Sequence, residues 1–280
     1  METTSAWIFG VVMYAYLAVT VIYLIYAVSR NQAIGRIATA LLAGALALHT
    51  VGLVYRWIET HKTGYGYVPL SNMYESLIFF SWTIVLLYLV LELLYKQKTI
   101  GVFVTPFAFL FMALTAIIPG VNSEINPLVP ALKSPWLAIH VITCFVGYAA
   151  FAVSFWFSLL YLIRESRERR DPSPSRFLPA ARVLDEISYR SILIGFPMLT
   201  LGIVTGAAWA NYAWGSYWSW DPKETWSLIT WFVDSAFLHA RLARGWSGRK
   251  AAFLSIIGFG AVIFTYFGVN YLISGLHSYA

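Results

Sequence analysis

The sequence predicts an all-α integral membrane protein with about eight transmembrane helices and both termini on the outer, periplasmic or lumenal, side. Of the 280 residues, 59% are hydrophobic and only 11% are charged, which leaves too little polar surface for a soluble domain. The apolar residues form runs of about 20, the length that a helix needs to cross the hydrocarbon. The basic residues lie in alternate connections between these runs. The bilayer is therefore the expected solvent for most of the chain.

The apolar runs follow one another with little sequence left between them, so residues 1–280 are predicted to form a single polytopic domain. The first run is interpreted as a retained span, because residues 1–5 contain Glu2 but no Lys or Arg and the run exceeds the 7 to 15 or so apolar residues of a signal peptide. The runs are 7–29, 37–58, 73–95, 101–118, 136–163, 191–212, 226–243 and 251–273.

The basic residues predict the orientation. One set of alternate connections contains only Arg56, Lys62, Lys133 and Lys223. The other set is cytoplasmic by the positive-inside rule, and it accounts for the formal charge of +6 without a nucleic-acid partner. It contains Arg30, Arg36, Lys96, Lys98, Arg164, Arg167, Arg169, Arg170, Arg176, Arg182, Arg190, Arg241, Arg244, Arg249 and Lys250.

The longest cytoplasmic connection, 164–190, is predicted to be a basic loop that contains a short amphipathic helix. Its second half places apolar residues at Leu178, Val183, Leu184 and Ile187, as expected for a helix on the membrane surface. Its arginines favour anionic lipid, and no chemistry is assigned to it. Cys144, inside an apolar run, is the only cysteine, so thiol chemistry is expected to belong to a partner.

Residues 209–226, WANYAWGSYWSWDPKETW, are predicted to form an outer aromatic loop. Aromatic rings commonly mark the membrane interface. Here seven rings crowd one connection together with Gly215, which permits a tight turn, and this favours a ligand-binding platform. Flat rings suit a planar apolar ligand such as a porphyrin. The rings belong to Trp209, Tyr212, Trp214, Tyr217, Trp218, Trp220 and Trp226.

The loop ends in a helix-start signal. Asp221 is a preferred N-cap residue, Pro222 suits the first helical position, and Glu224 completes a capping box. Lys223 is not needed for capping. It is either solvated or available to pair with a carboxylate such as a haem propionate.

Three histidines are candidate ligands. His140 and His277 are expected at the outer ends of their spans, and two imidazoles on opposite faces form a six-coordinate haem site. His49 lies near the middle of the second span, where an ionisable residue commonly marks a pathway or cofactor, although a packing role remains open. Arg56 follows seven residues later on the same helical face and is a further candidate for binding the cofactor.

At these residues the chain resembles the CcsA/ResC family of cytochrome c biogenesis proteins, the transmembrane haem-handling subunit of the System II synthase. The family's tryptophan-rich WWD domain is matched by residues 214–224. The likeness extends through 49–57, 69–76, 267–270 and 275–279.

The resemblance implies that His140 and His277 hold haem b against the WWD loop and that His49 ligates haem in transit. It also implies partners: a CcsB/ResB-like membrane subunit, apocytochrome c with its C-x-x-C-H motif, and a thiol-reducing thioredoxin-like protein. The expected activity is haem export and haem attachment, by a lyase subunit that is active only with its partner. The expected location is a bacterial cytoplasmic or thylakoid membrane. The alternatives are a System I-type protein that loads a haem chaperone and a b-type electron-transfer cytochrome with fixed haem.

Overall fold

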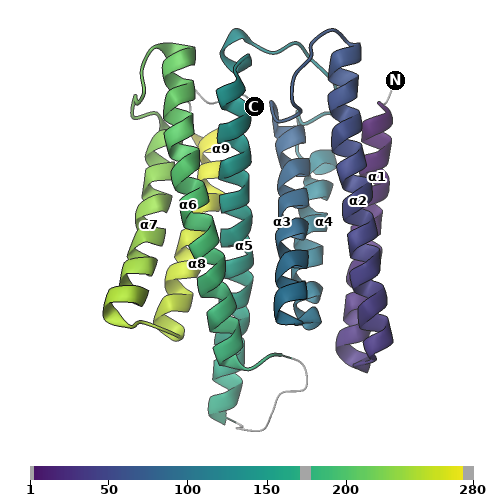
Figure 1. The fold of residues 1–280 in the computed structure, drawn as a ribbon, viewed down its shortest axis with the longest axis vertical. Helices are drawn as coiled ribbons and strands as arrows, with labels where there is room; N and C mark the ends of the chain where they lie inside the picture. The colour runs from purple at the N-terminus through teal and green to yellow at the C-terminus, as the bar shows by residue number, and fades with distance from the viewer. Residues whose placement is uncertain (1–2, 171–177, 274–280) are drawn as a thin grey trace. The chain divides into compact units, whose positions relative to one another are not determined.

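The computed structural model describes residues 3–170 and 178–273, and within these ranges the chain forms helices and connecting loops without a strand (Figure 1). The α-helices are α1 (Thr4–Ser29), α2 (Gln32–Lys62), α3 (Met73–Tyr95), α4 (Gly101–Ile117), α5 (Pro135–Arg170), α6 (Ala181–Trp214), α7 (Pro222–Arg244), α8 (Arg249–Ile263) and α9 (Val269–Leu272). A 3-10 turn, Lys98–Ile100, precedes α4, and a second one, Pro130–Leu132, precedes α5. A π-helical turn, Phe264–Gly268, joins α8 to α9.

Seven helical segments of the described ranges are long and apolar enough to cross a membrane, which confirms an all-α integral membrane protein. They comprise α1 to α6, with the turn before α4 included, and the continuous segment Arg249–Leu272. The remaining predicted run, 226–243, forms most of α7. At 23 residues α7 is about 34 Å long, but it carries Asp234, His239 and Arg241 and is less apolar. The eighth span remains a prediction.

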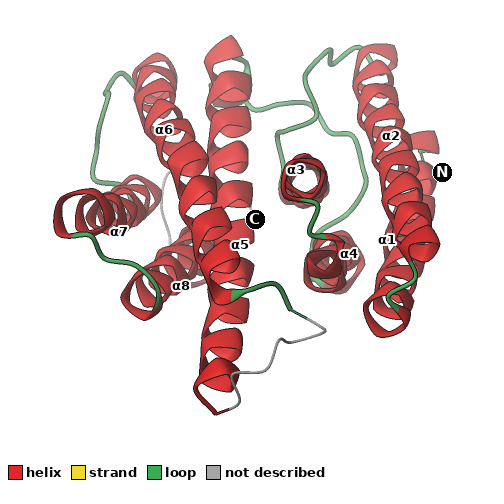
Figure 2. Ribbon diagram, turned by 60° about the horizontal axis from the view of Figure 1, so that its bottom comes forward, coloured by secondary structure: helices red, strands yellow, loops and turns green. Residues whose placement is uncertain are grey.

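The described helices cluster into two compact units, whereas the sequence predicts a single polytopic domain. The first unit ends at Lys133 and the second begins at Ser134. In the first unit, α1 packs against α2 and α4, and α3 packs against α4. In the second unit, α5 and α6 lie side by side along much of their length, and α8 contacts both α5 and α7 (Figures 1 and 2).

Short polar side chains fix where several helices begin. Thr3 accepts a hydrogen bond from the amide of Ala6, and Asn31 accepts one from the amide of Ala33. Asn72 does the same for Glu75 at 2.9 Å. Each contact satisfies an amide that has no partner within its helix. These caps place the entries of α1, α2 and α3.

Buried polar contacts bind the helices within each unit. In the first, the Glu92 carboxylate accepts hydrogen bonds from the hydroxyls of Tyr23 and Tyr88, each at 2.6 Å, and lies 3.1 Å from the Lys98 ammonium. In the second, the hydroxyl of Ser154 on α5 lies 2.8 Å from those of Ser188 on α6 and Ser255 on α8. Such contacts hold helices together where lipid provides no hydrophobic drive.

The amphipathic sequence within 164–190 does not form a separate helix in the described residues, which corrects the prediction. Helix α5 continues to Arg170 and α6 already begins at Ala181. Leu184 and Ile187 are buried in the first turns of α6. The reason is tertiary packing, because burial of these two side chains within the second unit stabilises the segment as the first turns of α6.

Candidate functional site

His140 lies on α5 and is oriented by the backbone of α6. Its Nδ1 atom is 2.8 Å from the carbonyl oxygen of Gly202. Because a carbonyl only accepts, Nδ1 carries the proton, and Nε2 is the basic nitrogen of a neutral ring. Metal-binding histidines are commonly fixed in this way, with the second nitrogen donating to a carbonyl.

The side of the His140 ring is fitted closely to α6. A Cβ atom at Gly206 would lie 2.7 Å from Nδ1 of His140, so only glycine leaves the ring its present place. The Trp209 indole stacks on the imidazole with ring centroids 5.8 Å apart and planes 20° apart. The Cys144 sulfur also lies 3.7 Å from Nδ1. These contacts fix the ring on several sides.

Only part of the predicted aromatic loop 209–226 is a loop. Helix α6 continues to Trp214 and ends at Gly215, whose φ of 75° is left-handed and favours glycine. Trp209 is 2% exposed and packs edge-on against Trp214, with centroids 5.0 Å apart. Trp209 therefore backs the histidine from inside the bundle and does not form part of an exposed surface.

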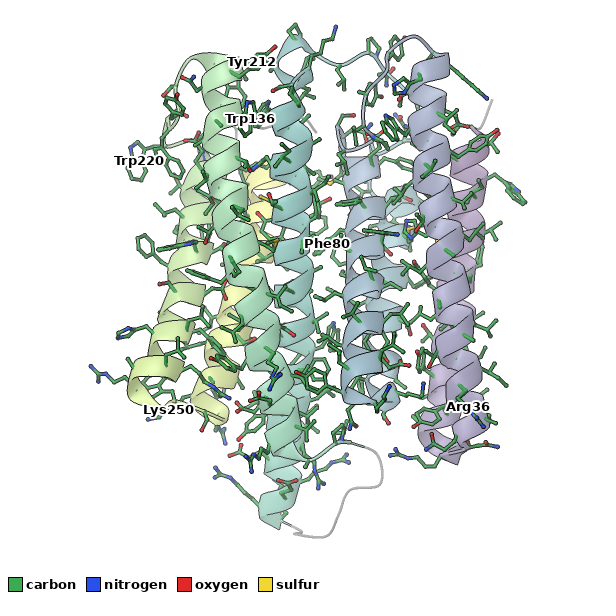
Figure 3. All side chains as sticks on the ribbon, in the orientation of Figure 1. Arg36, Phe80, Trp136, Tyr212, Trp220 and Lys250 are labelled. Carbon is green, nitrogen blue, oxygen red and sulfur yellow. The ribbon has the colours of Figure 1, made fainter. Side chains whose placement is uncertain are left out.

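The exposed aromatic surface is smaller than the sequence suggests. Trp220 is 68% exposed and Tyr217 is 63% exposed, and in Figure 3 Trp220 projects away from the helices. Trp218 is half-buried and contacts Trp220 edge-to-face at 5.7 Å. Trp226 turns inward onto Phe264, with centroids 4.1 Å apart. The rings that face outward thus come from the turn itself and from Tyr212, which is 62% exposed near the end of α6.

The predicted capping box is present at the start of α7, and it also shapes the loop. Asp221 accepts a hydrogen bond from the amide of Lys223, with Pro222 in the first helical position. The Glu224 carboxylate accepts from the amides of Ser219 and Asp221 at 2.8 and 3.1 Å. One carboxylate therefore holds the turn before α7 closed.

Trp220 adopts a left-handed φ of 61°, which is unusual for a large side chain. It stands directly before the capping residue Asp221, where Glu224 holds the amides on both sides of it. The local hydrogen bonds thus maintain a backbone conformation that presents this indole outward.

Lys223 lies in the first turn of α7, ahead of the predicted span. Burial lowers the pKa of its ammonium to about 8, and the Asp221 carboxylate partly opposes that effect. Its ammonium therefore loses its proton as the pH rises through about 8, because burial disfavours the charged form.

His49 is fully buried in α2 within the first unit. Its Nδ1 lies 2.9 Å from the hydroxyl of Tyr16 on α1, and the Phe9 ring meets it edge-on at 5.7 Å. Its Nε2 is buried and has no hydrogen-bond partner among the described residues. A buried nitrogen without a partner is costly, which makes this atom a candidate ligand position.

Arg56, a candidate for binding the cofactor, is buried, and its guanidinium is occupied by the protein itself. Its Nε lies 3.1 Å from the Glu75 carboxylate. Its two terminal nitrogens donate to the carbonyl oxygens of Ser123 and Glu124 at 2.6 and 3.1 Å. Arg56 therefore ties the connection after α4 to α2 and α3, which is a structural role.

The expected ligands do not form one observed constellation. His140 and the aromatic turn belong to the second unit, His49 and Arg56 to the first, and His277 lies outside the described residues. Sequence reasoning missed Tyr16 and the two glycines that face His140. The spacing Gly202-x-x-x-Gly206 was available as a signal, because small residues four apart let helices approach closely.

The fold and these sites define an all-helical integral membrane protein with an oriented imidazole beside an aromatic turn. The family model described as cytochrome c assembly protein matches residues 70–277. The chain belongs to this family, among its CcsA members, and is a cytochrome c biogenesis protein.

Two relatives illustrate the match. The cytochrome c biogenesis protein CcsA of Guillardia theta is 41% identical over 82% of this chain and 81% of its own. That of Gloeobacter violaceus is 39% identical over 85% of both chains. A solved structure of the cytochrome c haem lyase CcmF shares the fold with a TM-score of 0.69 at 18% identity. The match covers 95% of this chain but 47% of CcmF, so this chain spans about half of that protein.

Proposed function

We propose that the protein accepts haem b within the membrane and presents it on the outer side to apocytochrome c for covalent attachment, together with a CcsB/ResB-like subunit. The single observation that carries the proposal is the orientation of His140. Its Nδ1 donates to Gly202, 2.8 Å away, which makes Nε2 the coordinating nitrogen. Haem is the cargo of this protein and not its permanent cofactor.

The membrane orientation that fits this role has eight spans with both termini outside. Its support is the sorting of basic residues among alternate connections. The aromatic turn before α7 then faces the periplasm or lumen, where c-type cytochromes receive haem.

The outer site in this proposal consists of His140 and His277 as axial ligands and the aromatic turn as a surface for the porphyrin. Trp220 and Tyr217 offer exposed rings for stacking. Lys223, with a pKa of about 8, pairs with a propionate below that pH. Trp209 and Gly206 hold the His140 ring in place.

The inner station in this proposal is His49. Tyr16 contacts one ring nitrogen at 2.9 Å, and the other is buried without a hydrogen-bond partner among the described residues. When Nδ1 donates to the Tyr16 oxygen, Nε2 carries the lone pair that iron requires. A haem ligand would therefore satisfy an atom that the protein leaves unsatisfied.

Attachment forms two thioethers. Each cysteine sulfur of the C-x-x-C-H motif bonds to one vinyl carbon of haem, and the thiol proton goes to the other carbon, so no oxidant is consumed. The histidine of the motif replaces one axial imidazole. The chain's own contribution is to hold and orient the ring. A thioredoxin-like partner keeps the thiols reduced, and the chain acts as a lyase subunit only with its membrane partner.

The proposal is tested by maturation of a reporter c-type cytochrome in a host that lacks its own system and expresses this chain with a CcsB-like subunit. His140→Ala is expected to abolish covalent haem in the reporter. His239→Ala, an exposed histidine on α7, is the matched control. Wild-type maturation in His140→Ala would remove the assignment, and maturation only with an added haem chaperone would favour the System I-type role.

A further inference from the structure

A groove of about 480 Å³ lies between α5 and α8 in the second unit. It is at the end of α8 that carries Lys250, which Figure 3 labels. Arginines and apolar side chains line it together, among them Arg167, Arg170, Arg249, Leu159, Ile163 and Phe253. Neither the proposed haem stations nor the aromatic turn includes this groove.

The lining is polarised along the helices. On α5, Leu159 and Ile163 precede Arg167 and Arg170, and on α8, Phe253 follows Arg249 by one turn. Arg249, the first residue of α8, lies 4.0 Å from Glu165 near the C-terminal end of α5, so the basic ends of both helices lie together. From Leu159 to Arg170 the groove covers about 16 Å at the helical rise. One end is therefore cationic and the other apolar.

The cationic end has more positive than negative charge. The Glu165 carboxylate pairs with Arg169 at 2.6 Å and lies farther from Arg249, at 4.0 Å. Arg164 pairs with Glu168 at 2.7 Å. In the described part of the chain, no carboxylate is within ion-pair distance of Arg167 or Arg170. The groove is thus suited to an anion.

The apolar end presents two half-exposed side chains. Ile163 is 45% exposed and Phe253 is 47% exposed, next to the arginines. A free phosphate would meet the cations but leave these side chains bare. A lipid acyl chain would cover them while its phosphate met the arginines.

We propose that the groove binds one anionic phospholipid, with its phosphate among Arg167, Arg170 and Arg249 and an acyl chain along Ile163 and Phe253. A zwitterionic lipid offers the same phosphate with an added cation, which the arginines repel. The site is distinct from general attraction to the membrane surface because it is specific for one lipid position and one headgroup charge.

The test is native mass spectrometry of the purified full-length protein exchanged into detergent with phosphatidylglycerol or phosphatidylcholine. The wild type is expected to retain one phosphatidylglycerol and to bind phosphatidylcholine weakly. The variant R167Q/R170Q/R249Q removes three charges from the groove. Each lost arginine is expected to weaken binding by about fivefold, so the affinity of the variant for phosphatidylglycerol should fall on the order of 100-fold.

The matched control R36Q/K96Q/R244Q removes three exposed charges at other helix ends and should leave retention unchanged. The variant I163Q/F253Q tests the acyl part and should weaken binding severalfold. All these positions are on the surface, and an unchanged elution profile verifies folding. Wild-type retention in the groove variant, equal loss in the control, or displacement of the lipid by millimolar glycerol phosphate would overturn the proposal.

Discussion

Replacing Gly206 with alanine tests whether α6 orients His140 for iron. The added Cβ would lie 2.7 Å from Nδ1 and 2.8 Å from Cε1 of the imidazole. Ordinary contacts begin near 3.4 Å, so the ring must move by about 0.7 Å or turn, since a packed helix pair yields little. Either movement disturbs the 2.8 Å hydrogen bond to Gly202.

The expected cost to the fold is small compared with the cost to ligation. Overpacking of this size destabilises a protein by about 1–3 kcal/mol, and the lost hydrogen bond accounts for about 1 kcal/mol. Loss of an orienting partner typically weakens metal binding by about 10- to 100-fold. We therefore expect Gly206→Ala to remain inserted and folded but to bind haem at least tenfold more weakly.

The assay is haem titration of the purified protein, followed by the ferric absorption spectrum that reports axial ligation. Gly260→Ala is the matched control, because this helical glycine has open space around its Cβ position. Both variants gain the same helix propensity, about 1 kcal/mol. Exogenous imidazole should partly restore the low-spin spectrum of Gly206→Ala. Wild-type affinity and ligation in Gly206→Ala would refute the reasoning.

Three further predictions concern the aromatic turn and the first unit. Glu224→Ala removes the acceptor that closes the turn, so we expect about 1–3 kcal/mol of lost stability and faster proteolysis there; an unchanged cleavage pattern would contradict the closing role. Haem retention should fall as pH rises through about 8, because Lys223 then loses its proton, and Lys223→Arg should keep retention constant to higher pH; the same profile in both proteins would exclude the pairing. Arg56→Ala leaves the Glu75 carboxylate buried without its ion pair and should lower the unfolding free energy by about 3–5 kcal/mol, measured in denaturant against the exposed control Arg36→Ala; equal values would refute the structural role.

The spans were predictable because hydrocarbon length and helical geometry leave few options. The run 73–95 coincides with α3, and its start is marked by the cap at Asn72. The basic character of the region 164–190 was predictable, but its secondary structure was not. Whether an amphipathic segment stands alone or joins the next span depends on tertiary packing, which the repeat alone does not reveal.

The sequence predicted which residue types form the candidate site, but it predicted their burial and contacts less well. Crowded tryptophans indicated the turn, yet the burial of Trp209 depends on α5 lying against α6. Arg56 looked like part of a ligand pathway because it shares a helical face with His49. Its partners Ser123 and Glu124 lie 67 and 68 residues away in the sequence, and no local pattern points to them.

Asp234 was not among the predicted site residues, although an acidic residue within the run 226–243 is a sequence signal. It is buried in α7, and its Oδ2 has no hydrogen-bond partner among the described residues. A Cβ at Gly258 would lie 2.9 Å from its other oxygen, so α8 approaches it closely.

The most direct test of the account is the ferric absorption spectrum of the protein purified with its CcsB-like partner, for the wild type and for His140→Ala. The account predicts a low-spin, bis-imidazole spectrum in the wild type, its loss in His140→Ala, and its return when imidazole is added. An identical spectrum in both proteins, with haem content unchanged, would contradict the claim that His140 holds the iron.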